Sequence, residues 1–252
     1  MIDVLRSEWI KVRSIRAHWV LVIFAVAIPV VTASLVGMFI PEPETGSATD
    51  IISLISGVAV VSVLLLASLW VINLTSEYSH NTIRVTYAAV PARWRVVLAK
   101  ALVGSVVTIV VVAITFALAY LAGTAILSAR GADMSLPEGH DLVGVLVTLI
   151  ALGVIVSWFG LGLGAIIRNS PATVVVVLLW PLLLENLVTL ALTLSGVESA
   201  GKWMPYQQAI AAVTDADAGG NSLGRPGAHL YFGAIALGLL AVGTLLDRRR
   251  DA

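Results

Sequence analysis

The sequence predicts an all-α, polytopic membrane protein with six transmembrane helices. The chain has 252 residues, of which 59% are hydrophobic and 12% are charged, whereas a soluble domain is about 45–50% apolar and about 25% charged. The charges also cluster, so that residues 51–76 and 101–129 contain no Asp, Glu, Lys or Arg. Because about 20 apolar residues suffice for a helix to cross the hydrocarbon core, we expect residues 1–252 to form one transmembrane domain.

Six apolar runs give the spans. We place them at residues 19–40, 51–75, 97–127, 142–167, 172–194 and 230–246. The first should be kinked by Pro29, because proline removes a helical hydrogen bond. The third is long enough to require tilt or an extension into water. The last has 17 residues, near the lower limit for crossing.

The connecting segments differ in character. Residues 2–18 place apolar and basic side chains at helical spacing, which favours a helix lying on an anionic membrane surface; a plain charged flank is the alternative. In the fourth span Gly160 and Gly164 are four residues apart, a spacing that lets helices approach closely. Residues 195–229 form a long connector, in which 202–213 favours a short amphipathic helix.

The stretch 77–100 is a charged segment between two apolar spans. Pro91 interrupts it, lacks an N–H group and disfavours the α conformation at Val90, so one short helix should end there and another begin. Glu77 is expensive to place near the membrane without a partner, and we expect it to pair with a nearby arginine. Inner-leaflet anchoring is the alternative reading for the basic residues here, Arg93, Arg95 and Lys100.

The basic residues predict the orientation. With an even number of spans both termini lie on one side of the membrane, together with the stretch 77–100. That side holds Arg6, Lys11, Arg13, Arg16, Arg84, Arg93, Arg95, Lys100, Arg168, Arg248, Arg249 and Arg250. The other side holds Arg130, Lys202 and Arg225. Because basic residues at span ends are retained inside the cell, we expect this to be a multi-pass protein of the cell membrane with both termini in the cytoplasm.

Several kinds of chemistry are not indicated. The chain has no cysteine, which excludes disulfides and thiolate chemistry. Its four histidines are scattered over different segments, so we expect no metal site. The sequence contains no phosphate-binding loop ending in Lys-Ser or Lys-Thr, and its basic residues follow span ends rather than a nucleic-acid-binding surface. We therefore expect a chain that is not an enzyme and binds no nucleic acid.

One acid lies inside a span. Glu185, followed by Asn186, comes about 13 residues, or roughly 20 Å, after the start of the fifth span, and Trp180-Pro181 precedes it. Ionisable residues within spans are rare and commonly functional. A hydrogen-bonded helix break or a contact between two subunits is one interpretation. Substrate contact or proton coupling is the other.

The stretch from Glu77 onward resembles the permease subunits of type-2 ATP-binding-cassette transporters, as found in high-GC Gram-positive bacteria. The family has an acid, a Gly-Thr pair, a basic residue, a proline, further basic residues and a lysine opening the third span. The matching residues are Glu77, Thr82, Arg84, Pro91, Arg93, Arg95 and Lys100. Asn81 stands where the family often has glycine, and asparagine tolerates similar backbone angles. The segments SEWIKVRS and FGLGLGAIIRNSPATVVVVLLWPLLLEN also resemble the family, so the likeness extends over essentially the whole chain.

The resemblance implies a dimer of permeases, formed with a second copy or a homologous chain, that carries two separate ATPase subunits. It implies an interfacial helix before the first span, a coupling helix between the second and third, and short re-entrant helices between the fifth and sixth. ATP and Mg²⁺ would bind the ATPase, with no cofactor on this chain. Family substrates include drugs, antibiotic peptides, lipids and polysaccharides, usually exported, so a role in drug or antibiotic resistance is implied.

The residues expected to couple the permease to the ATPase follow from this likeness. They are Glu77, Asn81, Thr82, Ile83, Arg84, Tyr87, Pro91 and Arg93. Ile83 and Tyr87 are four residues apart, so one helical face could fill an apolar groove on the ATPase, with Arg84 at its rim. A proton-coupled secondary transporter and a membrane immunity or signalling protein stay open as alternatives.

Overall fold

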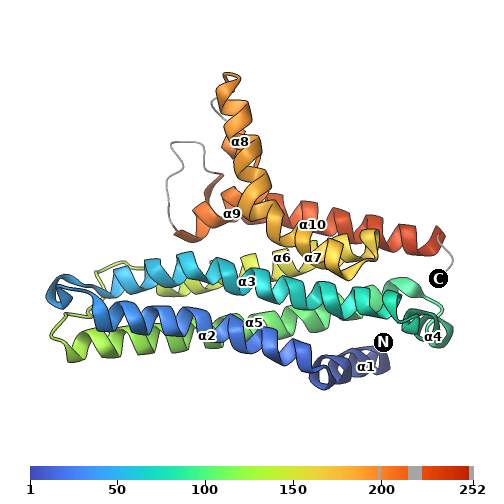
Figure 1. The fold of residues 1–252 in the computed structure, drawn as a ribbon, viewed down its shortest axis with the longest axis horizontal. Coiled ribbons are helices and arrows are strands. Elements are labelled where there is room, and N and C mark those ends of the chain that lie inside the picture. Colours follow the sequence, from blue (N-terminus) through green and yellow to red (C-terminus); the bar gives the residue numbers. More distant parts are fainter. Residues whose placement is uncertain (198–199, 215–222, 250–252) are drawn as a thin grey trace.

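Helices make up all regular secondary structure in the computed structural model, which describes residues 1–197, 200–214 and 223–249 (Figure 1). Within those residues six helices are long and apolar enough to cross a membrane. They are Arg16–Phe39, Ala48–Ser79, Arg93–Ala129, Leu142–Ile167, Ser170–Leu194 and Gly224–Asp247. The prediction of an all-α chain with six candidate spans is therefore confirmed.

The elements follow one another with short connections. The long helices are α1 (Ile2–Ser14), α2 (Arg16–Phe39), α3 (Ala48–Ser79), α5 (Arg93–Ala129), α6 (Leu142–Ile167) and α10 (Gly224–Arg249). The shorter ones are α4 (Thr82–Ala89), α7 (Ser170–Leu179), α8 (Glu185–Leu194) and α9 (Pro205–Thr214). Two 3₁₀ turns, η1 (Pro43–Thr45) and η3 (Ala200–Trp203), and a π-helical turn, η2 (Trp180–Leu184), complete the order.

Helix α3 lies at the centre of the bundle. It packs against α2, α5, α6 and α7, while α10 packs along α6 and α9. Among the six candidate spans α3 has the largest buried share. Figure 1 shows α2, α3, α5 and α6 side by side, with α8 projecting away from them. Much of α8 is therefore uncovered by the other described residues.

The small residues of α6 bring two neighbours close, as their spacing predicts. A methyl group on Gly160 or Gly164 would meet α3, at 3.1 Å from Val71 Cγ2 and 3.2 Å from Thr75 Cγ2 respectively. Gly162 faces the other way, and a methyl there would lie 2.8 Å from the backbone of α10 at Leu239. The glycines of α6 thus allow close contact on both sides.

Several predicted boundaries are corrected. The helix predicted over 2–18 ends at Ser14, because Ile15 has extended backbone angles before α2 begins. The helix that contains the third predicted span runs from Arg93 to Ala129, and the helix that contains the last begins at Gly224. The π-helical turn interrupts the fifth span, since Pro181 cannot donate a backbone hydrogen bond there.

Both described chain ends lie at one end of the bundle. The start of α1 and the last described turn of α10 lie there with α4 (Figure 1), and we call this the terminal end. Its placement in the cytoplasm stays a prediction from the basic residues. In the stretch 202–213, where a short helix was predicted, the structure has α9 at Pro205–Thr214. The rest of the 195–229 connector, at 198–199 and 215–222, lies outside the described residues, as does Arg250.

Candidate functional site

Helix α4 forms the predicted short helix between the second and third spans. Asn81 separates it from α3 by adopting left-handed backbone angles, with φ of 57°, the conformation for which asparagine is a tolerated substitute for glycine. Val90 leaves the helical conformation before Pro91, as the steric effect of proline requires. Between α3 and α5 the chain thus has one short helix, Thr82–Ala89, with a break on either side.

The packing of α4 corrects its predicted binding face. Ile83 and Tyr87 were expected to fill a groove on a partner, but they are only 3% and 7% exposed and pack against Val96 of α5. They hold α4 to its own chain. The opposite face carries Arg84, which is exposed, and Val85, which is 72% exposed. A partner that contacts the outward face of α4 would therefore meet Arg84 and Val85.

A shallow depression lies beside this exposed face. It measures about 400 Å³ and is lined by Arg84, Tyr87, Ala88, Pro91 and Arg93. Asn81 and Thr82 are also exposed at the start of α4. Six of the eight residues predicted to couple the chain to a partner thus line this depression or the adjoining surface. Ile83 and Glu77 lie beneath it.

Beneath α4 lies a buried ionic cluster, which we call the Lys100 cluster. It consists of Glu8, Lys11, Asn73, Glu77 and Lys100. Lys100 is 0% exposed, and its Nζ donates to Glu8 Oε2 at 2.6 Å, Glu77 Oε1 at 2.5 Å and Asn73 Oδ1 at 2.9 Å. Lys11 Nζ donates to Glu8 Oε1 at 2.6 Å and to Glu77 Oε1 at 2.9 Å. Two carboxylates and two ammonium groups leave the cluster neutral.

The Lys100 cluster joins α1, α3 and α5 and reaches α4. Thr86 Oγ1 on α4 donates to Glu77 Oε2 at 3.4 Å. The expectation that Glu77 pairs with an arginine is wrong, since its partners are lysines. Lys100 is buried rather than anchored at the membrane surface. Removing one member of such a buried pair is costly because its partner is left uncompensated.

The carboxylates of Glu8 and Glu77 also shift the pKa of Lys11. Burial alone would lower the pKa of Lys11, but Glu8 and Glu77 outweigh burial and raise this pKa above its usual value. Because the folded-state pKa lies above the unfolded value of about 10.4, the stabilisation from Lys11 is complete below that pH. It is lost as pH rises through the folded-state pKa. Lys11 therefore stays charged at neutral pH.

A second buried group at the terminal end is the Asp247 cluster, formed by Tyr78, Tyr87, Arg93, Arg168 and Asp247. Tyr78 donates to Asp247 Oδ2 at 2.7 Å and Tyr87 donates to it at 2.9 Å. Arg168 forms a salt bridge with the same carboxylate, and Arg93 donates to the Asp247 backbone carbonyl. The guanidinium of Arg93 lies 5.1 Å from the Tyr87 ring centre, and that of Arg168 lies 4.8 Å from the Tyr78 ring centre.

The Asp247 cluster fastens α10 to α4 and to the corner between α6 and α7. Burial, with the Asp247 carboxylate, raises the pKa of the Tyr87 phenol, so this hydroxyl stays protonated and donates. Four of the five members come from α3, α4, α5 and α10, and Arg168 lies at the end of α6. One end of α4 thus depends on the position of the last helix.

Glu185 lies in a hydrogen-bonded helix break. Its Oε1 accepts from Trp180 Nε1 at 2.8 Å and from the backbone N–H of Tyr206 at 3.1 Å. Its Oε2 accepts from the backbone N–H of Gln207 at 2.9 Å. These amides belong to the first turn of α9, where a negative charge is favoured by the helix dipole. Asn186 Oδ1 accepts from Gln207 Nε2 at 3.3 Å.

We expect Glu185→Leu to detach α9 from α8, whereas Glu185→Gln keeps one acceptor oxygen in place. The leucine variant leaves two backbone N–H groups and the Trp180 indole N–H without acceptors, at a cost of about 1–3 kcal/mol for each buried group. The measurement is thermal unfolding in detergent, with hydrogen exchange over 205–214. Equal stability and equal exchange in the two variants would remove this role from Glu185.

The sequence pattern indicates one part of this site and not another. The stretch 77–93 and Glu185 stand out by their charge within apolar surroundings. Glu8 and Asp247 do not, because each belongs to a terminal segment that also carries several basic residues and looks like a charged flank. Their positions in the helical repeat could have revealed them. Glu8 and Asp247 each lie on the apolar face of a helix, the face that packs against the bundle.

No three His, Asp or Glu side chains gather in a metal-binding arrangement within residues 1–197, 200–214 and 223–249. Comparison of the chain with protein-family models, with curated proteins and with solved structures gives no match. The resemblance to type-2 permeases therefore rests on sequence motifs. The structural features that we use to infer a function are α4, the Lys100 cluster, the Asp247 cluster and Glu185.

Proposed function

We propose that this chain is the membrane-spanning permease subunit of an ATP-driven transporter of the ATP-binding-cassette type. It would work as a dimer of permeases with two separate ATPase subunits, which bind ATP and Mg²⁺, and would export a drug, antibiotic peptide, lipid or other amphipathic substrate. The observation that carries the proposal is α4, a short helix outside the apolar spans that is fixed to the spans and exposes an outward face.

The first support is the mechanical connection of α4. It continues directly into α3 and α5 through the short breaks at Asn81 and Pro91. The Lys100 cluster links the same region to α1, and the Asp247 cluster links it to α10. A push on α4 by an ATPase would therefore move several spans as a unit, because packed and ion-paired elements shift together rather than deform continuously.

The second support is the exposed face of α4. Val85 is an apolar side chain held in water at the predicted cytoplasmic end, and Arg84 beside it carries a charge with no ion pair among the described residues. An apolar contact flanked by a charged rim is typical of a protein interface. We infer that Val85 inserts into the ATPase and that Arg84 pairs with an acid on it.

The third support is the uncovered surface of α8 and the turn before it. Figure 1 shows α8 projecting away from the bundle, and most of its side chains are apolar. The exposed members of this surface are Leu182, Leu183, Leu184, Leu187, Val188, Leu190 and Leu194. Lipid covers such a surface in a monomer, and a second permease would cover it in a dimer. Two copies meeting here would bring their Glu185 helix breaks together.

Val85→Asp is expected to weaken binding of the ATPase about thirtyfold or more, while the permease still inserts and folds. An aspartate cannot enter an apolar pocket without losing its hydration, and removing a central interface contact costs about 2 kcal/mol or more, or about thirtyfold in affinity. The measurement is pull-down of an ATP-binding-cassette ATPase from the same organism, with ATP-dependent transport assayed in parallel.

The matched control is Val143→Asp. Val143 is 70% exposed and lies at the other end of the bundle, in the first turn of α6. The Val143→Asp variant therefore introduces the same charge at an exposed valine far from α4. Normal ATPase binding and transport by Val85→Asp, with both variants well expressed, would rule out the coupling role of α4.

A further inference from the structure

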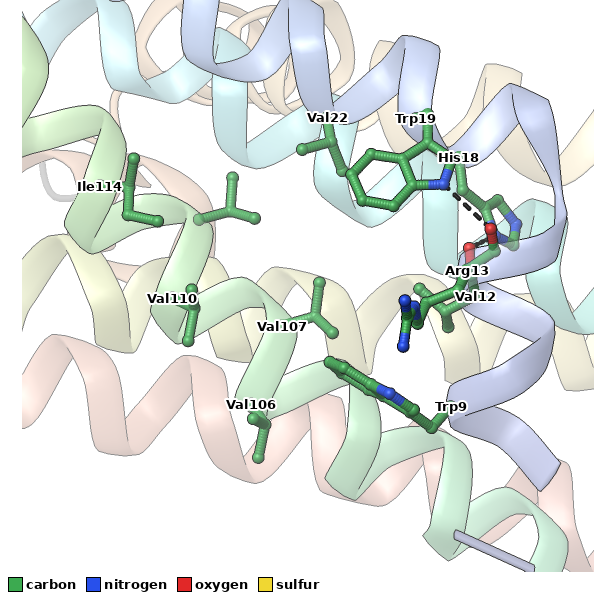
Figure 2. A pocket seen from close by; sticks show the side chains of 11 residues that line it. Trp9, Val12, Arg13, His18, Trp19, Val22, Val106, Val107, Val110 and Ile114 are labelled. Carbon is green, nitrogen blue, oxygen red and sulfur yellow. Dashed lines mark hydrogen bonds between the residues drawn. The ribbon is translucent and has the colours of Figure 1, made fainter. Parts of the chain in front are cut away.

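A pocket opens on the membrane-facing side of the bundle near the terminal end, where α1 turns into α2. It measures about 310 Å³ and lies between α1, α2 and α5 (Figure 2). Its wall on α5 consists of aliphatic side chains, including Val106, Val110 and Ile114, which are half exposed. Because these residues lie within a candidate span, the medium that meets them is lipid rather than water.

We propose that this pocket binds an anionic phospholipid of the bilayer, with one acyl chain between α1, α2 and α5 and the phosphate at Arg13. The proposal concerns the membrane and does not depend on transport. It requires three properties of the pocket: room for a chain, an apolar wall and a free positive charge at the mouth.

The size and lining fit an acyl chain. An engineered apolar cavity of about 150 Å³ holds benzene and stays free of water, so a pocket of about 310 Å³ has room for about twelve chain carbons. The polar side chains of the lining, Trp9, Arg13, His18 and Trp19, all come from α1 and the start of α2. Along α5 the wall is aliphatic, so a water there lacks the two to four polar partners that it needs. A hydrocarbon chain gains contacts with Val106, Val110 and Ile114 that it would lack against a smooth helix face.

The charge at the mouth fits a phosphate. Figure 2 shows the Arg13 guanidinium between the indole rings of Trp9 and Trp19, at the α1 side of the pocket. Arg13 forms no salt bridge among the described residues, although Lys11, two residues before it, is paired with both acids of the Lys100 cluster. A guanidinium binds a phosphate through two parallel hydrogen bonds.

The two indoles place the mouth at the depth of the lipid head groups. Trp9 and Trp19 are both about half exposed, and tryptophan is enriched at the boundary between hydrocarbon and water. Trp19 Nε1 donates to the backbone carbonyl of Arg13 at 3.0 Å. This hydrogen bond ties the start of α2 to the end of α1 and so fixes Arg13 over the pocket.

The test is native mass spectrometry of the full chain in mild detergent, titrated separately with phosphatidylglycerol and phosphatidylcholine. We expect the wild-type chain to bind phosphatidylglycerol about fivefold more tightly, the effect of one basic residue at an anionic surface. Arg13→Gln should remove this preference. Arg16→Gln, a neighbouring exposed arginine outside the pocket lining, should keep it.

A second pair of variants locates the acyl chain. Val110→Phe adds bulk inside the pocket and should weaken binding of both lipids, whereas Val20→Phe adds the same bulk on an exposed position outside it. Equal affinity for the two lipids in the wild-type chain, or an unchanged preference in Arg13→Gln, would overturn the proposal. Unchanged lipid binding by Val110→Phe, or a lipid-free dimer in place of the lipid adduct, would overturn it as well.

Discussion

Lys100→Met is expected to destabilise the folded chain by about 3–5 kcal/mol, the usual cost of removing one partner from a buried ion pair. Lys100 is fully buried and donates to Glu8, Asn73 and Glu77. Its loss leaves two buried carboxylates facing a single remaining lysine, Lys11. The measurement is thermal unfolding in detergent, together with the yield of monodisperse protein.

Two further variants test whether the loss of stability comes from uncompensated buried carboxylates or merely from removing a positive charge. Arg95→Met removes an exposed charge from the same helix and should change stability by less than about 0.5 kcal/mol, as surface substitutions do. Adding Glu77→Gln to Lys100→Met should restore part of the lost stability, since it removes one uncompensated carboxylate. Equal unfolding of Lys100→Met and Arg95→Met would show that the cluster contributes no stability.

Asp247→Asn is expected to release α10 from the terminal end. The substitution keeps the shape of the side chain but removes the charge that faces Arg168 and accepts from Tyr78 and Tyr87. Leaving Arg168 without its partner costs about 3 kcal/mol. We expect faster hydrogen exchange over α4 and the last turns of α10, with little change in α1.

Tyr87→Phe is the matched control for the Asp247 cluster. It removes a single hydroxyl and keeps the ring that packs on Arg93, so its effect should be about 1 kcal/mol. Exchange over α4 that is unaffected by Asp247→Asn would mean that α10 does not hold α4. The structural link between the last span and the proposed coupling helix would then be absent.

The spans could be predicted because each is marked by a continuous run of residues. The run 142–167 contains no charged residue, and its helix has the predicted bounds. The helix break at Pro91 follows from the backbone restrictions of proline alone. Features of this kind depend only on neighbours along the chain, so the amino-acid sequence is enough to predict them.

The pairings in the site could not be predicted in the same way. Lys100 and Glu8 are 92 residues apart, and Tyr78 and Asp247 are 169 apart. Which face of each helix meets its neighbour is decided by tertiary packing, for example by the close approach of α6 and α10 at Gly162. The prediction that Ile83 and Tyr87 contact a partner was wrong for the same reason. An apolar stripe on a short helix can pack equally well against its own bundle.

The central claim is that the chain works as a dimer of permeases carrying ATPases. Its most direct test is the mass of the complex obtained when the chain is co-expressed with a candidate ATP-binding-cassette ATPase from the same organism. We predict a particle containing two copies of this 26.4 kDa chain and two ATPases, and loss of the ATPases in Val85→Asp. A stable monomer that transports without an ATPase would contradict the account and would favour a secondary transporter.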